Sequence, residues 1–253
     1  MKQLTCVILI GLLIGAAAAT PAQAGHRIEL GPIFALNASK FFGQEADSAF
    51  DNDDQWTLNT ITGGALARFN FNEKLSVAAQ VIYGKRGGRF FNTEPSTDTM
   101  STYSFIVRLD YIEIPVLLRL RPELHSNLNP YIIAGPSIAF AVSGEFEVRL
   151  TETTSEGETI TEDRTLDRWD LYNASDIQLG MVIGVGLDLQ LDRYGFAVEG
   201  RYSGDFGNAF TNTSGYDETP EGQAALVHPD GTALQLRSGT LSLMFMVSYA
   251  LEI

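Results

Sequence analysis

The chain has 253 residues, of which 45% are hydrophobic, and its formal net charge is −14. An acidic balance of this size argues against a nucleic-acid partner, because surfaces that bind nucleic acid are basic. The length suits one all-β domain, and no heptad pattern, low-complexity tract or long internal repeat indicates another architecture.

The first residues have the pattern of a secretory signal peptide. Lys2 gives a positive start, Val7–Ala19 is an apolar run, and Ala22–Ala24 (AQA) is a small-x-small cleavage site. The apolar run is shorter than the about 20 residues that a spanning helix needs. We therefore expect residues 1–24 to be removed and residues 25–253 to form an outer-membrane β-barrel domain.

Eight segments alternate between apolar and polar residues as strands do. The predicted strands lie at 26–36, 57–70, 75–84, 103–120, 130–142, 176–191, 195–203 and 237–253. The connections are long at 37–56, 85–102, 143–175 and 204–236, and short at 71–74, 121–129 and 192–194. Outer-membrane barrels have short periplasmic turns and long outward loops. The pattern predicts an all-β fold, an eight-stranded antiparallel up-and-down transmembrane β-barrel in the cell outer membrane, with both termini periplasmic.

The segment 176–191 shows most clearly which face meets lipid. Its odd positions are all large and apolar, and its even positions are mostly glycine and polar residues. An apolar band of about 25 Å crossed at about 40° needs roughly 10 residues, which this segment exceeds. A soluble ligand-binding barrel would also alternate, but with its apolar face inward. The length and the short turns favour a barrel that spans lipid.

Aromatic residues near the predicted strand ends indicate girdles at the two membrane interfaces. Those toward the short turns are Phe69, Phe71, Tyr131, Tyr194, Phe196 and Tyr249. Those toward the long loops are Trp56, Tyr83, Tyr103, Tyr202 and Phe206. The alternative is ordinary strand composition, since aromatic residues are common in any sheet.

Three stretches resemble the outer-membrane protein beta-barrel domain of PorT-like proteins. They are Tyr111–Leu118 (YIEIPVLL), Pro130–Ser137 (PYIIAGPS) and Val198–Ser203 (VEGRYS). The resemblance covers essentially the whole mature chain and implies the barrel fold. Some relatives act in secretion-system assembly and most have no assigned activity, so it implies no specific activity here.

The segment 237–253 has the alternation of a closing strand, after which we expect no peptidoglycan-binding domain. The resemblance implies that its end is recognised by the barrel-insertion machinery. The residues expected to form this insertion signal are Phe245, Val247, Tyr249, Leu251 and Ile253. The family pattern usually ends in Phe, so Ile253 is a departure from it.

Six of the charged residues within the predicted strands are candidates for the lumen. Glu113 and Arg119 lie in the segment 103–120, and Glu199 and Arg201 lie in the segment 195–203. The other two are Arg68 in the segment 57–70 and Asp188 in the segment 176–191. An Arg facing the lipid midplane costs about 2–4 kcal/mol, and alternation turns all six into the lumen. An eight-stranded barrel is just wide enough to be filled by side chains. We therefore expect a charge network in the lumen. In it, Glu113 and Arg119 meet Glu199 and Arg201 across the barrel. Arg68 and Asp188 lie nearer the periplasmic end. The alternative is a charged constriction in a narrow pore.

Three basic residues, Lys85, Arg86 and Arg89, surround two glycines in the predicted loop 85–102. Clustered cations bind phosphate oxygens, so these residues are candidates for contact with lipopolysaccharide. The alternative is a solvated loop tip that balances the acidic loops nearby.

No catalytic or metal-binding arrangement stands out. His26, His125 and His228 are dispersed, and Cys6, the only cysteine, lies in the signal peptide. There is no G-x-S-x-G motif and no metal-ligand spacing. Asp51–Asp54 (DNDD) resembles half a calcium loop but lacks its Gly and closing Glu. We expect no enzyme activity, no cofactor and no metal.

Three functions remain open from the sequence. The first is a structural or interaction role, with a side-chain-filled lumen and long extracellular loops. The second is a narrow porin-like solute channel, and the third is an accessory subunit of a secretion or surface-assembly machine. The expected partners are outer-membrane lipid, lipopolysaccharide, the barrel-insertion machinery and envelope proteins.

Overall fold

The computed structural model describes residues 27–42, 56–95, 99–122, 128–154, 159–167, 175–209 and 237–252. These residues form nine strands: β1 (Arg27–Phe42), β2 (Trp56–Asn70), β3 (Leu75–Pro95), β4 (Thr99–Leu120), β5 (Leu128–Thr154), β6 (Thr159–Asp167), β7 (Ile177–Leu191), β8 (Tyr194–Asp205) and β9 (Arg237–Glu252). In these ranges no helix has the length and apolar character needed to cross a membrane. The expected signal peptide, residues 1–24, lies outside the described residues.

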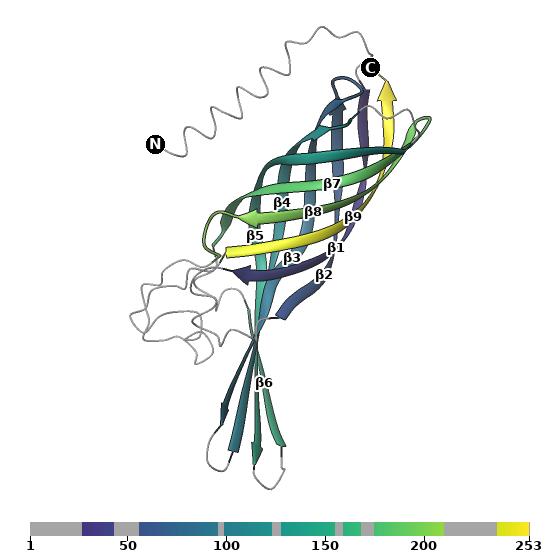
Figure 1. The fold of residues 1–253 in the computed structure, drawn as a ribbon. Helices are drawn as coiled ribbons and strands as arrows, with labels where there is room; N and C mark the ends of the chain where they lie inside the picture. Colours follow the sequence, from purple (N-terminus) through teal and green to yellow (C-terminus); the bar gives the residue numbers. More distant parts are fainter. Residues whose placement is uncertain are drawn as a thin grey trace.

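Eight of the strands close into an antiparallel barrel (Figure 1). The order around the ring is β1-β2-β3-β4-β5-β7-β8-β9, and β9 pairs with β1. The closing ladder runs from Arg27 opposite Glu252 to Phe42 opposite Arg237. Closure leaves no open sheet edge, so the backbone hydrogen bonds that lipid cannot supply are made within the protein. The predicted eight-stranded barrel is confirmed, and each predicted strand overlaps an observed one.

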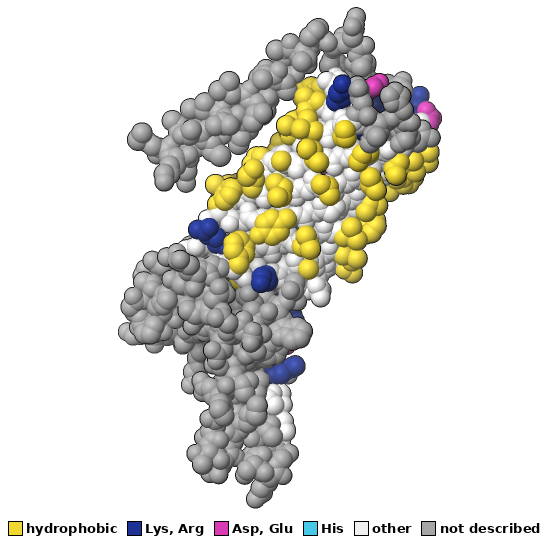
Figure 2. Space-filling view, in the orientation of Figure 1, with side chains coloured by type: hydrophobic (Ala, Val, Ile, Leu, Met, Phe, Trp, Pro, Cys, Tyr) yellow, Lys and Arg dark blue, Asp and Glu magenta, His cyan; other side chains and the backbone are white. Residues whose placement is uncertain are grey.

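The two faces of the strands alternate between lipid and lumen. In β7 the outward residues from Ile177 to Leu187 are 47–62% exposed, whereas Gln178, Val182 and Asp188 on the other face are at most 2% exposed. Figure 2 shows hydrophobic side chains gathered in a band on one face of the barrel, with basic side chains at its two edges. This alternation matches the lipid face expected for 176–191.

Aromatic rings lie near both edges of this band. The rings of Phe69 and Phe71 are 4.9 Å apart, and those of Tyr194 and Tyr249 are 5.4 Å apart, each pair in an edge-to-face arrangement. Exposed aromatic side chains near the opposite end are Tyr83, Tyr202 and Phe206. The side chains of Trp56 and Tyr103 lie outside the described residues. Tyr131 was wrongly placed in a girdle, because alternation in β5 turns it inward and leaves it 2% exposed.

Short turns join strands at one end of the barrel. After β2, the Asn72 side-chain oxygen accepts hydrogen bonds from the backbone N–H groups of Lys74 and Leu75, at 2.9 and 2.8 Å. Between β7 and β8, Asp192 has a φ of 53°. Asp tolerates this left-handed conformation better than most residues. The predicted short turns at these two places are therefore observed.

At the other end, β3 to β6 continue beyond the barrel as a sheet that we call the extension (Figure 1). Much of the predicted loops 85–102 and 143–175 is therefore strand, because β3 reaches Pro95 and β6 pairs with β5. The threonine-rich sequence of β6 favours a strand, since β-branched residues fit a pleated sheet. A register shift in the β4–β5 pairing between Asp110 and Tyr111 marks where the extension begins.

The lipid-facing assignment predicts the effect of a charge on β7. Val185→Arg should lower the free energy of unfolding by about 2–4 kcal/mol, because the side chain lies near the middle of the apolar band. Urea unfolding in phospholipid vesicles measures this loss. Thr161→Arg, at an exposed position of β6, is the matched control and should change little. Equal stability of the two variants would show that Val185 does not face lipid.

Candidate functional site: the charged lumen

The lumen holds a cluster of charged side chains that water does not reach from outside the barrel. Nine of them are at most 7% exposed: Glu29, Arg68, Arg86, Glu113, Arg119, Asp188, Glu199, Arg201 and Asp205. These are four guanidinium groups and five carboxylates, and Arg121 at the turn end supplies a fifth cation. Burying charge is costly unless the charge is paired and hydrogen bonded, so the pairing pattern decides whether the cluster is stable.

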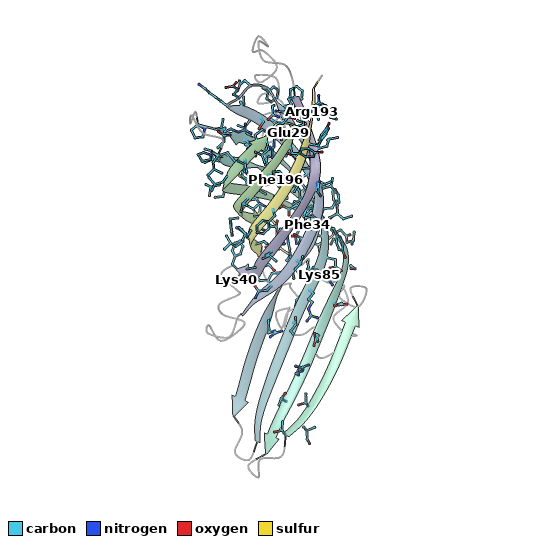
Figure 3. The ribbon with its side chains drawn as sticks, turned by 90° about the vertical axis from the view of Figure 1, so that its right-hand side faces the viewer. Glu29, Phe34, Lys40, Lys85, Arg193 and Phe196 are labelled. Carbon is cyan, nitrogen blue, oxygen red and sulfur yellow. The ribbon has the colours of Figure 1, made fainter. Side chains whose placement is uncertain are left out.

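At the end with the short turns, Glu29 organises the first group of contacts (Figure 3). Its carboxylate accepts hydrogen bonds from Arg68 at 2.9 Å, from the Asn70 amide at 2.9 Å and from the Ser248 hydroxyl at 3.0 Å. These partners come from β2 and β9, the two neighbours of β1. The Glu29 group therefore ties the closing strand pair together from the inside.

A second group centres on Asp188 of β7. One carboxylate oxygen binds Arg119 at 2.8 Å and Arg121 at 2.9 Å. Arg119 lies at the end of β4 and Arg121 just after it, and β4 is separated from β7 by β5 around the ring. The Asp188 group therefore spans part of the lumen rather than one strand pair.

Tyr131 connects this group to the middle of the barrel. The Arg119 guanidinium lies 3.5 Å from the centre of the Tyr131 ring, and the Tyr131 hydroxyl donates a hydrogen bond to Glu199 at 3.0 Å. A Cβ atom at Gly186 would lie 2.3 Å from the tyrosine ring. Gly186 on β7 therefore leaves the space that the ring occupies.

Two contacts cross the full width of the lumen. Strands β3 and β8 lie opposite each other in the ring of eight. From β3, Arg86 binds Asp205 of β8 at 2.9 Å, and Arg201 of β8 donates a hydrogen bond to Gln80 of β3 at 2.9 Å. Both contacts therefore join opposite walls of the barrel.

Arg86 is the centre of the group nearest the extension. Besides Asp205 it binds Glu113 of β4 at 2.6 Å, and its guanidinium lies 5.5 Å from the centre of the Tyr111 ring. Asp205 also accepts a short hydrogen bond from Ser238. Strands β3, β4, β8 and β9 therefore meet in one polar cluster at the base of the extension.

Little empty space remains between these groups. A cavity of about 20 Å³ lies among Arg86, Glu113 and Arg201 in the described part of the lumen. That volume holds about one water molecule. An interior this narrow is what the width of an eight-stranded barrel leads one to expect.

All six strand charges predicted from the sequence point into the lumen and are buried. Their hydrogen-bond and ion-pair partners differ from the predicted ones, although Glu113 and Arg201 line one small cavity and attract each other electrostatically, as predicted. Arg119 pairs with Asp188 instead of crossing to β8, and the carboxylate of Glu113 binds Arg86 instead of a group on β8. Arg201 does cross the lumen, but it meets Gln80.

Three members of the cluster were missed in the sequence: Glu29, Arg86 and Asp205. The predicted strands end at residues 84 and 203, so the sequence pattern places Arg86 and Asp205 in loops. Glu29 lies on the inward face of β1 with Ile33 and Ala35. Extending the alternation of the strands by two residues would have included Arg86 and Asp205.

The three basic residues proposed to contact lipopolysaccharide do not share one surface. Arg86 points into the lumen, because β3 continues through the predicted loop and alternation turns it inward. Lys85 is partly exposed and lies 3.5 Å from Asp110, and Arg89 is exposed. Figure 3 shows Lys85 toward the extension end of the barrel.

The outward residues of β9 lie in the hydrophobic band. Phe245, Val247, Tyr249 and Leu251 are 37–44% exposed. Ile253, the last residue of the expected insertion signal, lies outside the described residues.

The residues considered for catalysis or calcium binding also lie outside the described part: His26, His125, His228 and Asp51–Asp54. Among the residues that are described, no group of three or more His, Cys, Asp and Glu side chains has the arrangement of a metal site.

The contact between Gly186 and Tyr131 gives a test of the packing. Gly186→Val should destabilise the barrel by about 1–3 kcal/mol, because the new side chain collides with the ring. Urea unfolding in vesicles gives the value. Gly200→Val is the matched control, since a Cβ atom there meets nothing within 4 Å. The loss should shrink in a Tyr131→Ala background, and an unchanged loss would contradict the contact.

The chain is similar to several known proteins. Solved structures with similar folds include OprG from Pseudomonas aeruginosa (12% identity, TM-score 0.40, covering 91% of this chain and 97% of that chain). Ail of Yersinia pestis has 13% identity and a TM-score of 0.38, covering 90% of this chain and 100% of that chain. Neisserial surface protein A has 15% identity and a TM-score of 0.36, covering 88% of this chain and 97% of that chain. No curated protein matches. The model of the outer membrane protein beta-barrel domain matches residues 18–211. The chain therefore belongs to the outer membrane protein beta-barrel domain family, whose members lie in the outer membrane.

Proposed function

We propose that this protein is a non-conducting outer-membrane barrel whose role is structural or in binding partners through the extension. The observation that carries the proposal is the pair of contacts between opposite walls, Arg86 with Asp205 and Arg201 with Gln80. A solute would have to break both, and each break leaves buried charge unpaired.

The extension is the part of the described structure best suited to binding a partner. It projects away from the barrel as a sheet of β3, β4, β5 and β6 (Figure 1). Its described side chains are largely polar and accessible, including Glu145, Arg149 and Thr161. Recognition usually lies on such outward segments, held in place by a rigid scaffold. Long outward segments opposite short turns support an orientation with the extension outside the cell.

The filled lumen predicts electrical silence. The purified protein in a planar bilayer should show no steady single-channel current. The double variant Arg201→Ala with Gln80→Ala removes one cross-lumen contact and should produce brief openings, provided that its heat-modifiable gel mobility shows a folded barrel. A steady current from the unaltered protein, equal to that of the variant, would favour the narrow channel instead.

The proposed orientation predicts which positions are labelled on intact cells. The only cysteine is Cys6 in the expected signal peptide, so a single introduced cysteine is a clean reporter. Thr161→Cys in the extension should react with a membrane-impermeant maleimide, and Glu73→Cys in a short turn should react only after the cells are lysed. The opposite labelling pattern would reverse the orientation.

A further inference from the structure

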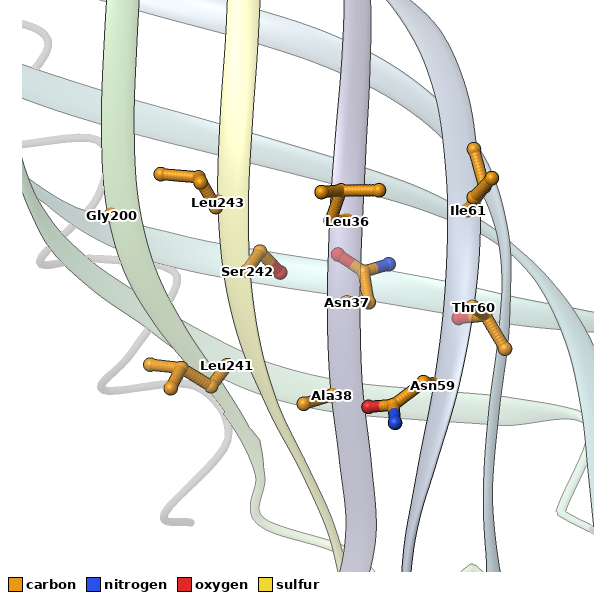
Figure 4. A pocket seen from close by; sticks show the side chains of 10 residues that line it. All are labelled: Leu36, Asn37, Ala38, Asn59, Thr60, Ile61, Gly200, Leu241, Ser242 and Leu243. Carbon is orange, nitrogen blue, oxygen red and sulfur yellow. The ribbon is translucent and has the colours of Figure 1, made fainter.

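The lipid-facing surface of β8, β9, β1 and β2 carries a groove of about 660 Å³ toward the extension end (Figure 4). Its outward-facing lining residues are apolar except for Asn59; the others are Leu36, Ala38, Ile61, Gly200, Leu241 and Leu243. The groove lies in the hydrophobic band, so an apolar chain is the chemistry that fits its walls.

Small residues create the groove and large ones form its walls. Leu36 lies opposite Leu243 on β9 and opposite Ile61 on β2, and Gly200 follows on β8 beside Leu243. A Cβ atom at Gly200 would have no neighbour within 4 Å. The row from Gly200 to Ile61 crosses three strand spacings, about 14 Å.

Two cations lie just beyond the groove on the side of the extension. Lys40 follows Ala38 on the outward face of β1 and pairs with Gly239, and Arg237 pairs with Phe42. This places the two residues diagonally on neighbouring strands, where Cα atoms are about 7–8 Å apart. Both are exposed. Figure 3 shows Lys40 at this end of the barrel, and Figure 2 shows basic side chains at this edge of the band.

Neither cation is neutralised by the residues around it that the structure describes. The ion pairs among those residues involve other cations, such as Lys85 with Asp110. Asn59 adds an exposed amide in the row of Ala38. An amide that faces the hydrocarbon edge has polar groups to satisfy. From the groove toward the extension, the surface therefore presents apolar walls, then the Asn59 amide, then the two cations Lys40 and Arg237.

We propose that this surface binds one molecule of the lipid A part of lipopolysaccharide. An acyl chain lies in the groove, Asn59 bonds the amide or hydroxyl groups at the chain's attachment, and Lys40 and Arg237 bind a sugar phosphate. Lipid A is chosen over a phospholipid because its amide and hydroxyl groups can donate hydrogen bonds to Asn59, whereas the ester linkages of a phospholipid only accept them. It also occupies the outer leaflet. The leaflet argument rests on the proposed orientation.

Native mass spectrometry of the full mature chain in detergent tests this site. The probes are lipid A, lipid A with its phosphates removed, and phosphatidylglycerol. Lipid A should bind one to one and more tightly than either other lipid. Lys40→Gln with Arg237→Gln should weaken lipid A binding by about 10- to 30-fold, close to the effect of removing the phosphates.

A second variant tests the groove separately from the charges. Gly200→Leu places a side chain in the groove, and its Cβ meets no other atom. It should therefore weaken the binding of lipid A and of lipid A without its phosphates to the same extent. Gly63→Leu, on the outward face of β2 but outside the groove, is the matched control, since a Cβ atom there meets only one backbone oxygen, at 3.9 Å. Lys74→Gln with Arg193→Gln at the turn end controls for charge. Both controls should bind as the unaltered protein does.

Equal binding of lipid A by all variants would overturn the site, as would equal binding of phosphatidylglycerol. Binding in detergent does not depend on orientation. A reversed cysteine-labelling pattern with lipid A binding intact would therefore overturn the orientation and leave the site, whereas correct labelling without binding would overturn the site alone.

Discussion

The constraint on which this structure depends is that lipid supplies no hydrogen bonds and solvates no charge. Ring closure between β1 and β9 meets the backbone part of that constraint. Alternation of the side chains meets the second part, because it turns apolar residues toward lipid and the nine buried charged residues toward the lumen. A ring of eight strands then encloses too little space for water to solvate those charges. They have to pair with one another, and the observed ion pairs meet that need.

The same pairing connects the membrane part to the extension. Arg86 lies on β3 shortly before that strand leaves the barrel, and it holds Glu113 of β4 and Asp205 of β8. Two strands of the extension are thereby anchored to the opposite wall. The β4–β5 register shift between Asp110 and Tyr111 lies immediately beyond this cluster. This polar cluster thus gives the extension a fixed base.

Alternation was enough to predict the eight strands, the lipid face and the inward direction of six charges, because a period of two is imposed by lipid on every strand. It did not predict which charges meet. Arg119 reaches Asp188 and not β8 because partner choice depends on strand stagger and side-chain length, which one sequence does not display. The extension was missed for a related reason: outside lipid the strands no longer need an apolar face, so β6 lacks the pattern by which strands were recognised. Arg86 was misplaced with it.

The most direct test is a double-mutant cycle on Arg86 and Asp205, whose side chains meet from opposite walls. With Arg86→Met and Asp205→Asn, unfolding in lipid vesicles should give a coupling energy of about 1–3 kcal/mol. A parallel cycle on Arg86 and Glu29, which lie in different groups, should be additive within about 0.5 kcal/mol. Additive behaviour of Arg86 and Asp205 would contradict a lumen closed by paired charges.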